Sequence, residues 1–191
     1  MNVTTLFKPL SVDVAPSKLR MARRAKLPNL PTLEDPLFEP LMQAYREGMR
    51  IFTPQGAWKT LSIAQWPVVP DSFAQCTHVT LAVVSAGESM DAAVDSAMAA
   101  GRSRDAWLLD AFGSEAVETI ADALDAYLRK HHGEGTQRFS PGYGHFPVTE
   151  NVRILNELGV DFVNAHPVSG MLVPRKSVVF LVGWHTLEYL L

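Results

Sequence analysis

Cysteine is nearly absent from this chain of 191 residues, which contains only Cys76. One cysteine cannot form an internal disulfide or a thiolate zinc site, so neither cross-links nor a cysteine-rich metal centre holds the fold together. Free cysteine is among the most buried residue types, and the stretch that begins at Cys76 is typical of a strand entering a core. We therefore expect a structural role for this thiol.

Long apolar runs and an excess of positive charge are also missing. No run reaches the ~18–20 apolar residues that a membrane-spanning helix needs, so we expect no membrane segment and a cytoplasmic protein. Seventeen Lys+Arg against twenty Asp+Glu give a net charge of −3. This charge argues against a nucleic-acid-binding protein, because such proteins neutralise phosphates with an excess of Lys and Arg side chains. P-loop, dinucleotide and G-x-S-x-G hydrolase motifs are absent as well.

Proline divides the chain, because nine of the thirteen prolines lie in the first 70 residues. This distribution predicts short elements joined by extended connectors in the first third. We expect a single domain over residues 1–191, whose parts are as follows. Residues 1–35 form an arm with a strand at 8–14 and a helix at 17–25, residues 36–75 a proline-rich segment with a helix at 40–49, and residues 76–185 the main core.

The first predicted helix is strongly basic. It carries Lys18, Arg20, Arg23, Arg24 and Lys26, with no acidic residue among them. Two interpretations are open: a docking patch for an acidic partner, or a solvated helix face.

From residue 77 the elements become longer and more regular. A nearly continuous apolar run is typical of a strand covered on both faces, and apolar residues at helical spacing indicate amphipathic helices. In order, we expect a strand at 79–84, helices at 90–98, 103–130 and 147–158, and a strand at 176–183. This pattern predicts an α+β domain with its helices packed on a sheet.

The segment 137–147, Q-R-F-S-P-G-Y-G-H-F-P, is the most informative part of the chain. Pro141 and Gly142 have the chemistry of a type II turn, which exposes backbone N–H groups. Arg138 is a planar fork suited to a carboxylate or phosphate, and Tyr143 offers an aromatic face. The segment can hold a ligand with an anionic group and a flat ring, or it is an ordered surface loop in which Arg138 pairs with a protein carboxylate.

Three stretches together resemble the activation, or AdoMet-binding, domain of cobalamin-dependent methionine synthase, and more closely its free-standing relatives. Residues 138–143, R-F-S-P-G-Y, fit the R-x-x-x-G-Y loop of that family. Residues 110–118, D-A-F-G-S-E-A-V-E, are similar to its helix D-x-x-G-S that continues to a glutamate. Residues 171–177, M-L-V-P-R-K-S, are similar to its M-x-P-x-K-S stretch. The resemblance implies a twisted, mainly antiparallel sheet with helices packed on it.

The resemblance also implies AdoMet binding in the service of a corrinoid. In the family, the domain presents AdoMet to oxidised cobalamin while a flavodoxin-type donor supplies an electron. Carried over, Arg138 meets the AdoMet carboxylate, while Pro141, Gly142 and Tyr143 line the site. A chain of 191 residues cannot also house the other modules of a synthase, so cobalamin is carried by a partner, either a corrinoid-binding protein or methionine synthase modules.

On this interpretation the chain is an accessory protein, at most one component of a methyltransferase, without a catalytic residue of its own. The alternative is a non-catalytic ligand-binding or scaffold module of the same fold that has lost AdoMet binding.

Two acids are candidates for receiving the α-amino group of AdoMet. If Ile120 is the centre of the buried stripe of its helix, Asp110 falls about 80° away at the rim and Glu118 about 160° away. Asp110 can therefore look into a cleft beside the sheet, whereas Glu118 can do so only if another segment covers its side of the helix. The geometry favours Asp110 and the resemblance favours Glu118, and each is otherwise a solvated helix acid.

The histidines suggest a competing class, a metal enzyme, since imidazole binds several transition metals. His131, His132, His145, His166 and His185 show no i, i+4 pair of the kind that binds metal on a helix. We expect no metal site, and we expect His131 and His132 to complement the negative end of their helix.

Overall fold

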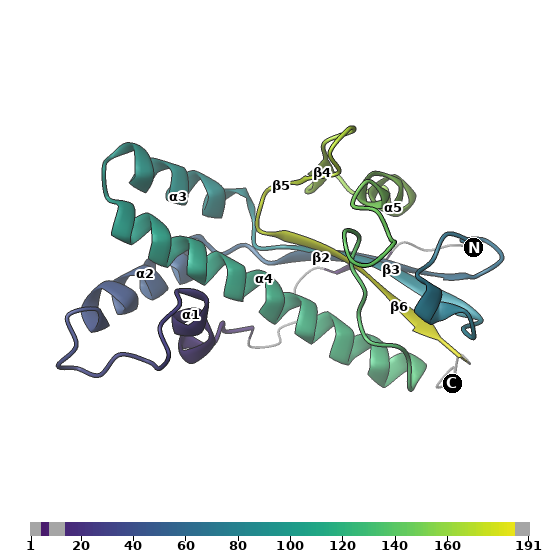
Figure 1. Ribbon diagram of the computed structural model, residues 1–191, viewed down its shortest axis with the longest axis horizontal. Coiled ribbons are helices and arrows are strands. Elements are labelled where there is room, and N and C mark those ends of the chain that lie inside the picture. Colours follow the sequence, from purple (N-terminus) through teal and green to yellow (C-terminus); the bar gives the residue numbers. More distant parts are fainter. Residues whose placement is uncertain (1–4, 8–13, 186–191) are drawn as a thin grey trace.

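The computed structural model describes residues 5–7 and 14–185. Four strands form one sheet in the order β1-β2-β3-β6, and all neighbours are antiparallel (Figure 1). They are β1 (Thr5–Phe7), β2 (Gln55–Ser62), β3 (His78–Ser85) and β6 (Ser177–Trp184). The short strands β4 (Asn164–Ala165) and β5 (Leu172–Val173) pair separately. The predicted α+β class with a mainly antiparallel sheet is therefore confirmed.

Helices lie on both faces of this sheet. One hydrophobic cluster joins a sheet face to four helices: α1 (Lys18–Arg24), α2 (Phe38–Ile51), α3 (Glu88–Ala99) and α4 (Ser103–His132). A second cluster joins the other face to α5 (Glu150–Leu158) and to the 3-10 turn η1 (Asp71–Phe73). The long α4 runs diagonally across the molecule, so one helix contacts α1, α2, α3 and the sheet (Figure 1).

The central strands are buried on both faces, as their apolar runs predict. In β3, Val79, Leu81 and Val83 belong to the cluster beneath α5, whereas Ala82 and Val84 face the four-helix side. The alternation follows from the two-residue period of a strand.

Local chemistry sets several of the helix ends. The Ser17 side chain accepts a hydrogen bond from the N–H of Arg20 and so caps α1. Gly87 opens α3 with φ of 94°, and Gly159 ends α5 with φ of 63°. Both values lie in the left-handed region, where glycine has no steric cost.

The strand β2 is absent from the sequence prediction, which placed only a helix and connectors in 36–75. Polar residues interrupt its sequence Q-G-A-W-K-T-L-S, and their side chains are only partly buried. The stretch therefore lacks the apolar run that marks β3 and β6. The strand predicted at 8–14 lies, up to residue 13, outside the described residues.

The basic helix α1 packs against α4, and two of its cations pair with a buried acid, so it is not only a solvated face. Arg20 and Arg24 pair with Glu115, which is completely buried. Tyr45 Oη donates to the Pro16 carbonyl at 2.9 Å and ties the start of α1 to α2. The buried Glu115 therefore explains two of the basic residues of this helix, Arg20 and Arg24.

The prediction for His132 is wrong. Its ring lies against Trp184 in the sheet, with centroids 5.1 Å apart, and burial, followed by the charges of His131 and His78, lowers its pKa. The reason is that α4 ends over the sheet, which removes the imidazole from water. His131, by contrast, places Nδ1 2.8 Å from the Tyr127 carbonyl one turn earlier.

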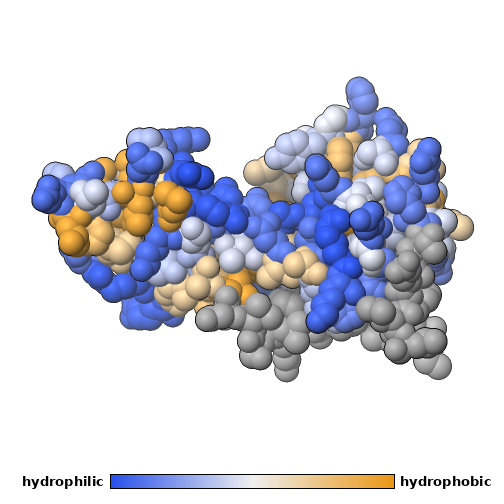
Figure 2. Space-filling view, turned by 90° about the horizontal axis from the view of Figure 1, so that it is seen from below, coloured by the Kyte–Doolittle hydropathy of each residue, from blue (hydrophilic) through white to orange (hydrophobic). Residues whose placement is uncertain are grey.

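Figure 2, a view from below, shows apolar residues gathered at the end of the molecule that holds α2, α3 and the first turns of α4. Leu33, which precedes α2, and Met98 on α3 are exposed to 82% and 55%. The surface is hollowed between this helical end and the rest of the molecule (Figure 2). Within the described residues, no helix has both the length and the apolar character needed to cross a bilayer.

Candidate functional site

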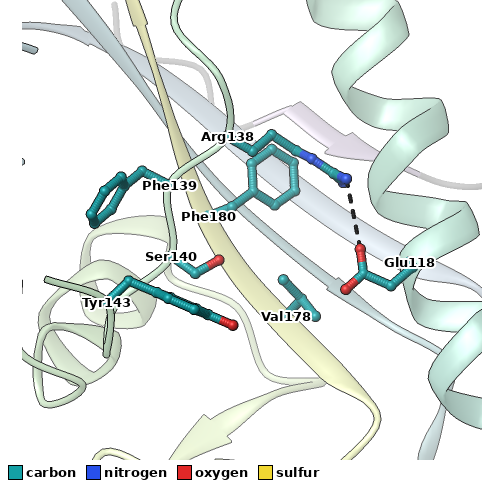
Figure 3. A pocket seen from close by; sticks show the side chains of 7 residues that line it. All are labelled: Glu118, Arg138, Phe139, Ser140, Tyr143, Val178 and Phe180. Atoms are coloured by element: carbon teal, nitrogen blue, oxygen red, sulfur yellow. Dashed lines mark ion pairs between the residues drawn. The ribbon is translucent and has the colours of Figure 1, made fainter. Parts of the chain in front are cut away.

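A pocket of about 360 Å³ lies between α4, the segment that follows it, and β6 (Figure 3). Seven residues line it: Glu118, Arg138, Phe139, Ser140, Tyr143, Val178 and Phe180. Two are charged and of opposite sign, two carry hydroxyls, and the others are apolar. A cavity of this size, with an apolar wall and a few polar groups, is of the kind that binds small molecules.

Backbone pairing with β6 positions the segment that carries Arg138. The N–H of Phe139 donates to the Leu181 carbonyl at 2.9 Å, and the N–H of Leu181 donates back at 2.8 Å. Neighbouring side chains of an extended segment point to opposite faces. Phe139 therefore packs with Phe73 and Phe146, while the guanidinium of Arg138 lies over the ring of Phe180, 5.5 Å from its centroid.

Two acids of α4, one helical turn apart, contact Arg138. Its Nη2 lies 2.6 Å from Asp122 Oδ1 and 3.6 Å from Glu118 Oε2. Asp122 Oδ2 also accepts from Arg20 at 2.9 Å, and this hydrogen bond is the main reason that the pKa of Arg20 is raised. Within the described part of the chain, Nε and Nη1 of Arg138 make no hydrogen bond, so most of its donors stay free.

Of the two candidate acids, the pocket contains Glu118. The segment that carries Arg138 lies over the side of α4 on which Glu118 stands, and this meets the condition under which that acid faces a ligand (Figure 3). Asp110 does not line the pocket, and it pairs with Lys176 Nζ at 2.7 Å. Eight residues of helix separate the two acids by about 12 Å along the axis.

The predicted turn is present, and of its three predicted site residues, Pro141, Gly142 and Tyr143, only Tyr143 lines the pocket. Gly142 has φ of 98°, as the third position of a type II turn requires. Its N–H donates to the Phe146 carbonyl at 2.8 Å, so that group is not available to a ligand. Pro141 is buried, and neither of the two lines the pocket. Tyr143 is 68% exposed and stands at the open edge.

Sequence reasoning missed Asp122 and the wall formed by Val178 and Phe180. The wall has a signal in the sequence, since alternate residues of a buried strand face the same side and Phe180 shares the α4 side with Val182. Asp122 follows Glu118 at i+4, but nothing local to α4 shows that Arg138 returns to that turn.

The histidines do not gather. Among residues 5–7 and 14–185, no group of three or more His, Cys, Asp or Glu side chains is arranged to hold a metal ion. Cys76 is buried beside Phe73 and Gly183, and burial raises the pKa of its thiol, which keeps it protonated.

Comparison with known proteins finds no matching family model and no matching curated protein. Among solved structures, the crystal structure of the MetH reactivation domain bound to AdoHcy superposes with a TM-score of 0.66 at 14% sequence identity. The alignment covers 97% of this chain and 78% of that one. The chain therefore has the fold of the MetH reactivation domain.

Proposed function

We propose that this chain binds AdoMet and AdoHcy in the pocket beside Tyr143. The observation that carries the proposal is the pairing of Arg138 and Glu118, opposite charges 3.6 Å apart on the rim of that pocket. An α-amino acid is a zwitterion whose carboxylate and ammonium need one partner of each sign. Arg138 receives the carboxylate and Glu118 the ammonium.

The free donors of Arg138 support this assignment. Asp122 and Glu118 both lie against Nη2, so Nε and Nη1, which lie on different edges of the guanidinium, each remain able to donate a hydrogen bond to a ligand carboxylate. Stacking of the guanidinium over Phe180 holds its plane while the ligand approaches. The contacts of Arg138 with Asp122 and Glu118 therefore do not have to break completely before a ligand binds.

The apolar wall suits the nucleoside part of the ligand. This wall consists of Phe180 and Val178 on β6. Tyr143 stands at the open edge of the pocket, and its side chain is mostly exposed to solvent. A purine that covers the tyrosine removes apolar surface from solvent and gains ring contact. The hydroxyls of Ser140 and Tyr143 point toward the same space (Figure 3), where they can bond the polar edges of a nucleoside.

In the cell, this binding serves corrinoid-dependent methyl transfer. The chain acts as an accessory protein that holds AdoMet for cobalamin carried by a separate corrinoid protein or by methionine synthase modules, with a flavodoxin-type electron donor. The likeness to the MetH reactivation domain and the three motif stretches support this role. The methyl group and the redox chemistry belong to the cofactors, and this chain supplies binding and orientation.

A second function, a scaffold module that no longer binds AdoMet, is favoured by one contact. Asp122 lies closer to Arg138 than Glu118 does, 2.6 Å against 3.6 Å. An arginine already neutralised by its own chain has less to gain from a ligand carboxylate.

Isothermal titration with AdoHcy separates the two functions. Under the first, wild type gives saturable heat and Arg138→Ala weakens binding at least tenfold, since a hydrogen bond to a charged group contributes about 1.5–3 kcal/mol. The matched control is Arg46→Ala, which removes an exposed arginine whose one acidic partner among the described residues is Glu39 on α2.

Methylthioadenosine, which lacks the amino-acid group, sharpens the test. It should bind wild type more weakly than AdoHcy does, and this difference should disappear in Arg138→Ala. If wild type gives no heat with millimolar AdoHcy, the proposal is wrong and the scaffold function stands. If Arg138→Ala weakens both ligands equally, the assignment of the ligand carboxylate to Arg138 is wrong.

A further inference from the structure

A shallow cavity of about 280 Å³, open to solvent, lies against α1 and shares no residue with the pocket beside Tyr143. It is lined by Arg20, Arg23, Arg24, Lys26 and Glu115. Four cations and one anion therefore surround one small space.

The charges of this cavity do not balance. Glu115 is completely buried, and its two oxygens are taken by Nε of Arg20 at 2.8 Å and Nε of Arg24 at 2.9 Å. Arg20 has Asp122 as a further partner. Two acids thus neutralise two arginines. Arg23 and Lys26 are exposed, and neither has an acidic partner within the described chain.

The backbone at Lys26 carries an unusual conformation. Its φ is 58°, and among the described residues it is the only one other than glycine with a positive φ. Lys26 follows the C-cap of α1, and the N–H of Leu27 donates to the Ala22 carbonyl, which is the ending that normally uses glycine. A side chain there costs free energy, so this chain keeps a cation at the cavity against its backbone preference.

We infer that this cavity binds the phosphate group of a small phosphorylated molecule. Arg23 and Lys26 supply two unbalanced charges, which match a phosphate dianion better than a single carboxylate. The guanidinium fork bonds two phosphate oxygens and the ammonium adds a point charge. Arg20 and Arg24 stay paired with Glu115, and their positive charges attract the phosphate without direct contact.

The test is a titration with pyrophosphate at constant ionic strength, followed through backbone amide shifts of isotope-labelled protein. Wild type should show saturable shifts at residues of α1 and its C-terminal turn. Arg23→Ala should weaken binding at least fivefold. Lys26→Gly should also weaken binding yet raise the melting temperature, because glycine relieves the positive φ. This second variant remains informative if Arg23→Ala folds poorly.

The matched control is Lys130→Gln, which removes one exposed positive charge from α4 outside the cavity. If Lys130→Gln and Arg23→Ala weaken pyrophosphate binding equally, the effect depends on net charge alone, and the inference is overturned. It is also overturned by an absence of saturable shifts, or by binding of hexaglutamate without pyrophosphate, which would make α1 a surface for an acidic protein. Tighter binding of ADP than of pyrophosphate supports the inference with a phosphate ester as ligand, and the reverse order supports it with the free anion.

Discussion

The carboxylate of Asp122 lies 2.6 Å from Nη2 of Arg138, so an acid of α4 orients the guanidinium on the rim of the candidate pocket. Asp122→Asn keeps the shape and removes the charge. We expect AdoHcy affinity to fall about fivefold, since one charge-assisted contact that holds the arginine in place contributes on the order of 1 kcal/mol. Calorimetric titration measures this change.

The control for Asp122→Asn is Asp125→Asn, which removes an acid from the same helix that pairs with Arg129 instead. If both variants lower the affinity for AdoHcy equally, Asp122 acts only through the net charge of the protein. If Asp122→Asn strengthens binding, Asp122 competes with the ligand for Arg138 and does not position it.

Tyr143 tests whether the pocket uses a ring face or a hydroxyl. The side chain is 68% exposed, so its removal leaves the fold intact. Tyr143→Ala should weaken AdoHcy binding by about 1 kcal/mol, the magnitude of a ring contact. Tyr143→Phe should change the affinity little. Equal loss in both variants would instead assign the contribution to the phenol oxygen.

The sequence could predict elements whose signal is local. The apolar runs at 79–84 and 176–183 each act within a few residues, and the structure confirms the strands that they predict, β3 and β6. Strand β2 was missed because polar residues interrupt its apolar ones, and their partial burial depends on distant segments that cover the sheet.

The candidate site shows the same limit. The sequence singled out Arg138 and Tyr143 from the chemistry of one segment, and it left Asp110 and Glu118 open. Only the crossing of that segment over α4 brings Glu118 and Asp122 within reach of Arg138. Helix periodicity places a residue around its own axis, but it does not say what covers each side.

Glu115 and its two arginines give a prediction about stability. Removing both arginines leaves a completely buried carboxylate whose remaining partner is the Thr119 hydroxyl, 3.3 Å from Oε1. The double variant Arg20→Ala, Arg24→Ala should therefore lower the free energy of unfolding by about 3 kcal/mol. Glu115→Leu alone should change it by less than about 1 kcal/mol, because the freed arginines return to water. Urea unfolding measures both.

Adding Glu115→Leu to the double variant should restore most of the lost stability, because no buried charge then remains. Arg46→Ala, which breaks an exposed pair on α2, serves as control and should cost less than about 1 kcal/mol. A double variant that unfolds like wild type would show that water reaches Glu115.

His132 makes the stability of the fold depend on pH. Its pKa in the folded protein lies below the ordinary 6.5, chiefly because burial penalises the charged ring, with smaller effects of His131 and His78. Above pH 6.5 the ring is neutral in both states and costs nothing. As the pH falls from 6.5 through the lowered pKa, the unfolded chain takes up the proton first, so stability decreases. We expect His132→Gln to flatten this part of a urea-unfolding profile between pH 7.5 and 5. A slope that persists in His132→Gln would assign the pH dependence to another group.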